Sequence, residues 1–286
     1  MRRHYKAFIL DLDGCIYVGD RLTPGSDRAV ERLREMGIKI IYLTNNSGYT
    51  SEEYCIKLRK LGIECVEEHV LTSGEVAASY IMENFGKSKI LPITGEGFKE
   101  YCRRIGHVLL PIERWNEAEH VVVGLDREVN YWKLRAGLRA ILTGAKFVAT
   151  NTDKTYPTPD GLDPGAGAIV AALRESSGIE PIVIGKPSRI IMEAALKRLN
   201  MSPDEVLVVG DRVETDILAG KNVGADTALV LTGVSRREDL IGLPPNIKPT
   251  YVAENLLKLV EIIYACLLYT SDAADDGESV DLGGRR

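Results

Sequence analysis

The chain has 286 residues, 45% of them hydrophobic, and a formal net charge of −5. A chain of this length can bury a substantial core, arranged as one large domain or two smaller ones. The modest acidic charge argues against a nucleic-acid-binding protein, and no apolar run approaches the roughly 18 residues that span a membrane.

Short apolar runs alternate with helical patterns along most of the chain. The runs predict strands at residues 7–10, 39–43, 181–184, 206–209 and 228–231. The segments between them predict helices near residues 25–36, 51–61, 165–176, 188–199 and 214–222. Because the strand runs are continuously apolar, they are typical of a parallel sheet that helices cover on both faces. The predicted fold class is therefore α/β, with a doubly wound, Rossmann-like parallel sheet.

The middle of the chain has elements of its own. The stretch from residue 46 to residue 186 is too long for one crossover between neighbouring strands. Its pattern predicts strands at residues 90–94, 120–125 and 146–150 and helices near residues 96–105 and 131–142. We therefore predict a core of residues 1–79 and 180–265 with an α/β domain inserted at residues 80–179.

The cysteines and the N-terminus indicate the compartment. Cysteines 15, 55, 65, 102 and 266 form no CxxC pair and no metal-ligand spacing. The basic start MRRHYKAFIL is cut short by Asp11, so a signal peptide is not expected. The prediction is a cytoplasmic protein with reduced thiols.

The end of the chain differs from the rest. Residues 266–286 carry five acidic residues and two arginines. CLLYTSDAAD and VDLGGRR in this stretch resemble the in-frame translation of a sequencing-library adaptor, although a natural acidic terminus could have a similar composition. We expect residues 266–286 to be non-native or disordered and exclude them from inferences about function.

The first predicted strand ends in two carboxylates, in the sequence AFILDLDGCIY. Asp11 and Asp13 are separated by one residue, so their side chains face the same side of an extended chain. Two like charges placed together repel unless a cation or a shared proton lies between them. A simple turn also fits LDG, so this motif alone leaves both interpretations open.

Three later motifs also follow predicted strands. LTNNS contains Thr44 and Asn45, and a hydroxyl with main-chain N–H groups in a turn can hold an anion. IGKPS contains Lys186, which can neutralise a phosphate. VVGDRVETDI contains Asp211 and, in the next helix, Asp216. Each motif alone also fits a helix cap or a surface residue, but ligands of parallel sheets bind at the carboxyl ends of the strands, where all of them fall.

In chain order the motifs read DLDG, TNN, GKP and GDRxxTD. This set resembles the haloacid-dehalogenase-like (HAD) hydrolase superfamily. The resemblance is closest to subfamily IIA with a C2-type cap, which contains 4-nitrophenylphosphatases, phosphoglycolate phosphatases and NagD-like proteins, and it covers essentially residues 6–264. It implies an Mg²⁺-dependent phosphatase of small phosphorylated metabolites.

The resemblance also implies roles for the motif residues. Asp11 would be the nucleophile that forms an aspartyl-phosphate, and Asp13 would protonate the leaving group and then activate water. Thr44, Asn45 and Lys186 would bind the phosphoryl group of the substrate.

The same resemblance implies a metal site. Mg²⁺ would be held by Asp11, the main-chain carbonyl of Asp13, and Asp211, which are the oxygen ligands that this ion prefers. Asp216 would lie beside these ligands and orient water or Lys186. The cation would also relieve the repulsion between the neighbouring carboxylates.

In the resembling branch, the inserted domain is a cap that closes over the site and sets substrate choice. The segment NTDKTYPTPDGLDPGAG would return to the core as an ordered loop. Its residues Asn151, Asp153 and Tyr156 could face the substrate or could simply be solvated. We expect no nucleic-acid or membrane partner, and a homodimer is compatible with the resemblance.

Two other functions would keep the same motifs. One is a phosphometabolite-binding or regulatory protein without turnover, and the other is a phosphotransferase whose acceptor is not water. An aspartate at position 13 favours hydrolysis over a lasting phosphoenzyme, because the related ion pumps carry threonine there. The identity of the phosphorylated substrate is not encoded in these motifs.

Overall fold

Parallel β-sheets covered by helices form the computed structural model, which describes residues 4–158 and 161–272. The first sheet has the strand order β15-β14-β13-β1-β4-β5, and all its neighbours pair in parallel. Its strands are β1 (Ala7–Leu10), β4 (Lys39–Thr44), β5 (Val70–Thr72), β13 (Val206–Gly210), β14 (Asp226–Val230) and β15 (Tyr251–Ala253). The predicted α/β class with a doubly wound parallel sheet is confirmed.

Helices cover both faces of the first sheet. They are α1 (Ser26–Glu35), α2 (Ser51–Lys60) and α9 (Leu256–Asp272) on one face, and α3 (Ser73–Phe85), α7 (Arg189–Leu199) and α8 (Leu218–Val223) on the other. Along β1 the side chains alternate, because Phe8 and Leu10 pack with the first set and Ala7 and Ile9 with the second. The unbroken apolar run of this strand is therefore explained by burial on two faces.

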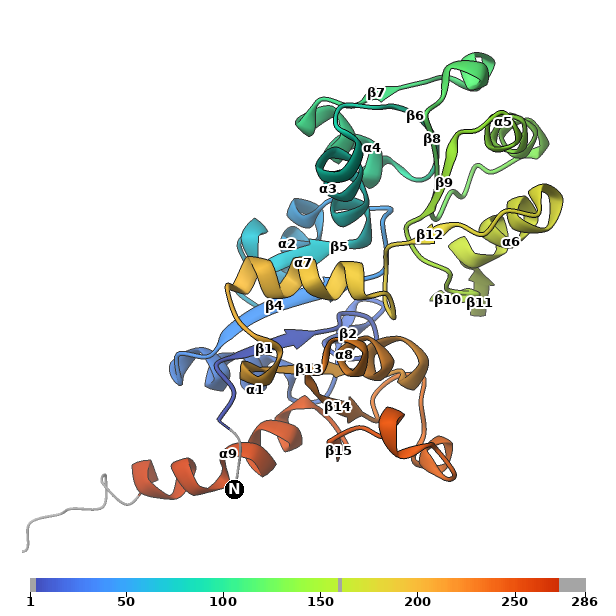
Figure 1. The fold of residues 1–286 in the computed structure, drawn as a ribbon. Coiled ribbons are helices and arrows are strands. Elements are labelled where there is room, and N and C mark those ends of the chain that lie inside the picture. Colours follow the sequence, from blue (N-terminus) through green and yellow to red (C-terminus); the bar gives the residue numbers. More distant parts are fainter. Residues whose placement is uncertain (1–3, 159–160, 273–286) are drawn as a thin grey trace, which may run out of the picture.

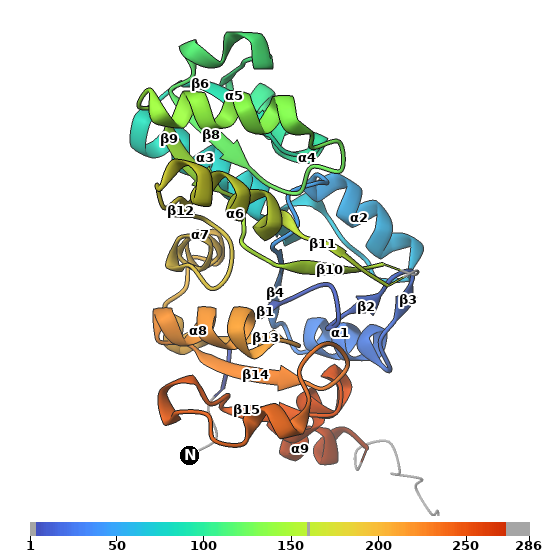
Figure 2. The ribbon, with the colours of Figure 1, turned by 90° about the vertical axis from the view of Figure 1, so that its right-hand side faces the viewer.

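A second parallel sheet lies at the other end of the molecule (Figures 1 and 2). Its order is β12-β9-β8-β6-β7. The strands are β6 (Lys89–Ile93), β7 (Val108–Leu109), β8 (His120–Val123), β9 (Lys146–Ala149) and β12 (Ile182–Val183). Helices α5 (Tyr131–Leu142) and α6 (Ala166–Ser177) pack on one face, and α3 and α4 (Glu96–Ile105) on the other.

The segment 181–184 was predicted as a strand of the core sheet, but its two strand residues, 182 and 183, pair in the second sheet. Ile182 pairs with Val148 and Val183 with Ala149. The apolar pattern of a buried strand is the same in either sheet, so the pattern could not distinguish them. The predicted domain boundary at residues 79/80 falls inside α3, and the one at 179/180 falls just before β12.

Two short hairpins contain the remaining strands of the described residues. They are β2 (Tyr17–Val18) with β3 (Arg21–Leu22), and β10 (Thr155–Thr158) with β11 (Gly161–Pro164). The second hairpin lies where the sequence predicted an ordered loop. At the end of the chain, α9 runs to Asp272 with a break in helical geometry at Tyr264. The rest of the predicted non-native tail, residues 273–286, lies outside the described residues.

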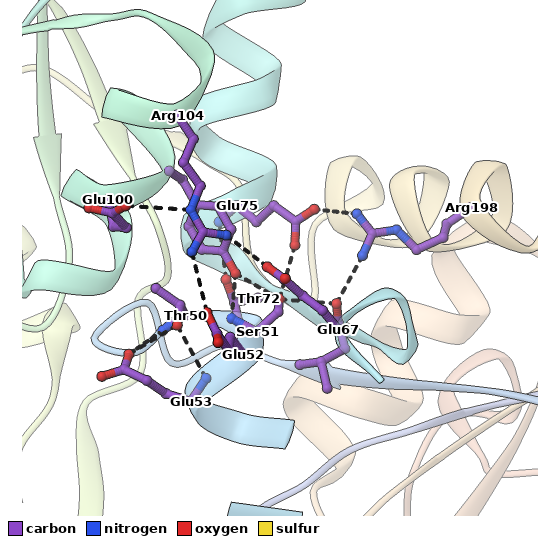
Figure 3. Close-up of polar contacts among 12 residues, drawn as sticks. Thr50, Ser51, Glu52, Glu53, Glu67, Thr72, Glu75, Glu100, Arg104 and Arg198 are labelled. Carbon is purple, nitrogen blue, oxygen red and sulfur yellow. Dashed lines mark hydrogen bonds and ion pairs between the residues drawn. The ribbon is translucent and has the colours of Figure 1, made fainter. Parts of the chain in front are cut away.

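Polar contacts join the two sheets at the start of α2 (Figure 3). Arg104 of α4 forms ion pairs with Glu67 at 2.8 Å and with Glu52 at 3.7 Å. The hydroxyl of Tyr101, also in α4, accepts a hydrogen bond from the main-chain N–H of Ser51 at 2.5 Å and donates one to Ser51 Oγ at 2.7 Å. The exposed ion pairs stabilise the junction little, whereas the buried Tyr101 hydroxyl satisfies a main-chain donor that would otherwise be unpaired.

The prediction that all cysteines are reduced is wrong for two of them. Cys55 of α2 and Cys65 form a disulfide, with their Cα atoms 5.2 Å apart. The chain turns back after α2 and buries both residues in the same core cluster, which the sequence spacing alone could not reveal. Cys15 and Cys102 are free and buried. No helix in the described part of the chain is long and apolar enough to cross a membrane.

Candidate active site

The carboxyl ends of strands from both sheets meet at the predicted motifs. Asp11 follows β1, Thr44 ends β4, and Asp211 follows β13. These three strands are neighbours in the first sheet, so their ends lie at one edge. Lys186 arrives from the second sheet, three residues after the end of β12. The second sheet therefore supplies part of the candidate site as well as lying next to it.

Lys186 is the centre of a buried charge cluster. Its Nζ lies 2.5 Å from Asp11 Oδ1 and 2.6 Å from Asp216 Oδ1, and it donates to the Leu43 carbonyl at 3.2 Å. The side chains of Lys186 and Asp216 are 4% and 2% exposed, and that of Asp11 is 12% exposed. Burial alone would lower the pKa of Lys186, but the two carboxylates outweigh it and raise that pKa. The lysine is therefore held as a cation.

Three carboxylates converge beside this lysine. Asp11, Asp211 and Asp216 each offer an oxygen, and these atoms lie within 4.8 Å of one another. Burial raises the pKa of Asp11, and the positive charge of Lys186 offsets part of this rise. Burial, reinforced by the charge of Asp216, raises the pKa of Asp211 to about 6. The cluster thus carries more negative charge than a single lysine neutralises, which is the electrostatic setting of a cation site.

Asp211 is held by a loop that the sequence analysis did not identify. Its Oδ2 accepts a hydrogen bond from the Val234 N–H at 2.6 Å, and its main-chain carbonyl accepts one from the Ser235 N–H at 3.0 Å. Gly14 and Gly233 approach so closely that a Cβ on either would collide with this carboxylate. The available signal was TGVS, one residue after the end of β14, a polar, glycine-containing segment at another strand end of the same sheet.

Asp13 differs from Asp11 in its surroundings. Its side chain is open to solvent, whereas Asp11 is partly buried. Protein around Asp13 still desolvates the carboxyl group and raises its pKa, although Lys57 and Lys186 act in the opposite direction. A raised pKa at an accessible carboxyl group is the property expected of a group that exchanges protons with a substrate or water.

Thr44 begins a tight turn at the end of β4. Its Oγ1 accepts a hydrogen bond from the Asn46 N–H at 3.1 Å, and Asn46 Oδ1 accepts one from the Gly48 N–H at 2.9 Å. Because the Thr44 oxygen acts as an acceptor in this turn, its hydroxyl hydrogen can be donated elsewhere. This arrangement suits a turn that binds an anion.

Asn45 has a different environment from the one predicted. Its side-chain amide is already bonded to the main chain of Lys186 and to Asp153. The side chain therefore does not point at an open substrate position in this structure. Asn151, which is buried, donates to the Asn45 carbonyl at 2.7 Å. Two of the loop residues left open by the sequence, Asn151 and Asp153, thus contact the candidate site.

The third of these loop residues, Tyr156, lies in the hairpin β10–β11. Its hydroxyl accepts a hydrogen bond from Arg127 Nε at 3.1 Å and donates one to Asp163 Oδ2 at 3.1 Å. These contacts are exposed and come from the inserted region alone. They do not connect Tyr156 to the carboxylate cluster.

Comparison with known proteins agrees with this geometry. A family model described as haloacid dehalogenase-like hydrolase matches residues 8–107, and a second, HAD-hydrolase-like model matches residues 183–259. The matched segments contain the strands and loops that carry Asp11, Thr44, Lys186 and Asp211.

Several relatives match nearly the whole chain. An acid sugar phosphatase of Staphylococcus aureus (strain USA300) is 39% identical over 254 residues, which cover 89% of this chain and 96% of the relative. Among solved structures, a p-nitrophenyl phosphatase from Archaeoglobus fulgidus superposes with a TM-score of 0.84 at 38% identity, covering 91% of this chain and 99% of that one. A glycerol phosphate phosphatase from Mycobacterium tuberculosis, solved with magnesium, gives a TM-score of 0.83 at 31% identity, covering 90% and 76%.

The fold and the site thus define a protein of the α/β class with a doubly wound parallel sheet and an acidic, lysine-containing centre at its strand ends. The chain belongs to the haloacid dehalogenase-like hydrolase family.

Proposed function

We propose that this protein hydrolyses small phosphate monoesters in an Mg²⁺-dependent reaction through an aspartyl-phosphate on Asp11. Its class as a phosphoric monoester hydrolase follows from the family and from relatives that are named phosphatases. The observation that carries the proposal is the convergence of Asp11, Lys186, Asp211 and Asp216 within one buried cluster. A carboxylate that can act as a nucleophile, next to a lysine and to further carboxylates that can hold a cation, suits the hydrolysis of a phosphate ester.

The residues of the cluster fit a divalent cation. Asp11 and Asp211 supply carboxylate oxygens, and the main-chain carbonyl of Asp13 is the third proposed ligand. Asp216 Oδ1 is engaged by Lys186 and Asp216 Oδ2 accepts from the Arg212 N–H at 3.1 Å, which supports a role beside the ligands. Hard oxygen donors of this kind suit Mg²⁺. When bound, the ion would offset carboxylate charge and withdraw electrons from the phosphoryl group.

The protein side chains then divide the chemistry. Asp11 attacks phosphorus as its carboxylate, whose charge Lys186 stabilises, and the bond to the leaving oxygen breaks as Asp13 gives that oxygen a proton. Lys186 and the Thr44 hydroxyl stabilise the oxygens of the transferring phosphoryl group. Asp13 next removes a proton from water, which attacks the aspartyl-phosphate and releases phosphate. The raised pKa of Asp13 supports the first of these proton transfers.

We propose that the second sheet and its helices form a cap that selects the substrate. Support comes from its place between the Thr44 and Lys186 motifs and from the contacts of Asn151 and Asp153 with Asn45. The names of the relatives point to sugar phosphates and glycerol phosphate as the first substrates to test. Cytoplasmic localisation remains part of the proposal.

The experiment is phosphate release by the full-length protein from a panel of phosphate esters. It compares Mg²⁺ with EDTA, and wild type with Asp11→Asn. We expect release that needs Mg²⁺ and is abolished by the substitution. Ester binding without release from a folded protein would instead favour a binding or regulatory role. Ester loss that depends on an added acceptor, without equivalent free phosphate, would favour a phosphotransferase.

A further inference from the structure

Both ends of the Asn45 side-chain amide form hydrogen bonds. Its Oδ1 accepts from the Lys186 N–H at 2.7 Å, and its Nδ2 donates to the Lys186 carbonyl at 3.0 Å. The same Nδ2 faces both carboxylate oxygens of Asp153, at 3.1 and 3.2 Å. Asn45 is only 8% exposed. The Asn45 side chain thus binds both the main-chain N–H and the main-chain carbonyl of Lys186.

This pairing fixes where the Lys186 side chain starts. Two hydrogen bonds to the main chain of Lys186 restrict the position of its Cα, so the Nζ at the end of the side chain is confined to a smaller volume. That Nζ is shared between Asp11 and Asp216 at 2.5 and 2.6 Å. A displacement of the Lys186 backbone would therefore move the cation relative to the attacking carboxylate.

Asp153 in turn sets the orientation of the Asn45 amide. A carboxylate can only accept hydrogen bonds, so the nitrogen end of the amide must face it, and a charged acceptor strengthens the bond. Asp153 is itself placed by its N–H, which donates to Asn151 Oδ1 at 3.1 Å, while Asn151 Nδ2 donates to the Asn45 carbonyl. Both residues follow β9 of the second sheet.

We propose that Asp153 and Asn45 are positioning residues: Asp153 orients the Asn45 amide, and Asn45 holds Lys186 between Asp11 and Asp216. The inference rests on the proposed phosphatase function and deepens it. It assigns the second sheet a part in arranging the catalytic lysine, in addition to the selection of substrate. Asn45 is then a residue that acts through Lys186 and not a direct ligand of phosphate through its side chain.

The kinetic test is a double-mutant cycle with Asp153→Ala, Asn45→Ala and the double variant. We expect Asp153→Ala to lower kcat/KM about tenfold, the size of one lost hydrogen bond to a charged group. Asp153→Asn, which can turn its carbonyl oxygen towards Asn45, should restore most of the loss. The double variant should be no slower than Asn45→Ala. Thr152→Ala, an exposed neighbour in the same turn, is the matched control and should stay close to wild type.

Two substrates with different leaving groups, 4-nitrophenyl phosphate and glycerol phosphate, separate positioning from substrate contact. A residue that acts on Lys186 should lower kcat/KM by the same factor for both esters. Losses that differ between the esters, or losses that add in the double variant, would overturn the proposal because Asp153 would then act independently of Asn45.

A readout without turnover keeps the proposal separate from the proposed function. Hydrogen exchange of the main-chain amides in peptides covering Lys186 should be at least several-fold faster in Asp153→Ala than in wild type, because the Lys186 N–H bond to Asn45 weakens. Unchanged exchange in a folded variant would overturn the proposal that Asp153 and Asn45 hold the main chain of Lys186. A folded wild type that hydrolyses neither ester would refute the phosphatase function. The exchange result would still decide whether Asp153 and Asn45 position Lys186.

Discussion

Replacing Asp211 by asparagine should stabilise the metal-free protein while destroying its activity. The pKa of Asp211 rises from its usual value near 4 to about 6 because the carboxyl group is buried and faces Asp216. A rise of about two pKa units corresponds to about 3 kcal/mol of unfavourable free energy when the group is ionised. An asparagine can still accept the Val234 N–H and carries no charge. We expect Asp211→Asn to be more stable than wild type by about 3 kcal/mol at pH 8 in EDTA.

The pH dependence gives this prediction its sign. The folded pKa of Asp211 lies above the unfolded one, so the folded state binds more protons between about pH 4 and pH 6. The contribution of Asp211 to wild-type stability therefore worsens as pH rises through this window and stays constant above it. The advantage of Asp211→Asn should be largest at pH 8 and should disappear near pH 4.

Urea unfolding in EDTA, repeated from pH 4 to pH 8, measures the effect. Asp204→Asn is the matched control, since it removes the same charge from an exposed position. Adding Mg²⁺ at pH 8 should raise the stability of wild type and not that of Asp211→Asn. The reasoning is refuted if Asp211→Asn is no more stable than wild type at pH 8 in EDTA.

Three further outcomes follow from the structure. His120 is 2% exposed, and burial lowers its pKa to about 4. Because the unfolded chain binds a proton at this histidine at a higher pH than the folded one, wild type should lose about 1–3 kcal/mol more stability than His120→Gln between pH 7 and pH 4. Equal losses in pH-dependent urea unfolding would contradict this. Tyr101→Phe removes both hydrogen bonds to Ser51, and should cost about 1–3 kcal/mol in urea unfolding, whereas an unchanged midpoint would show that the hydroxyl contributes nothing. Reduction of the Cys55–Cys65 disulfide should destabilise the protein by about 2 kcal/mol; a Cys55→Ala/Cys65→Ala variant should not respond to reductant, and a wild type that also fails to respond would argue against the disulfide.

Much of the first sheet could be predicted from the sequence because its signals are local. Strand β1 and helices α1 and α2 show apolar periodicity, a capping threonine at Thr50, or a polar residue directly after the strand. The edge strands β5 and β15 are three residues long, which is too short for periodicity to reveal. The short strand β12 was placed in the wrong sheet because its partner is decided by tertiary packing.

Some residues of the candidate site could likewise be predicted from the sequence, and others could not. Asp11, Lys186 and Asp211 could be predicted because each charged residue follows an apolar strand. The roles of Asn45 and Asp153 could not be predicted, because 108 residues separate them in the chain and their hydrogen bonds depend on how β9 meets β4. The loop at Val234 was missed since it binds Asp211 through a main-chain N–H, which any residue but proline can supply.

Detection of phosphate on Asp11 would test the central claim most directly. Asp13→Asn should slow the attack of water on the intermediate, so mixing this variant with 4-nitrophenyl phosphate and Mg²⁺ and quenching in acid should preserve the aspartyl-phosphate. Mass spectrometry should then find one added phosphoryl group on the peptide that contains Asp11, and none when EDTA replaces Mg²⁺. Full release of 4-nitrophenol by wild type, together with an unmodified Asp11 peptide and a phosphoryl group on another residue, would contradict the account.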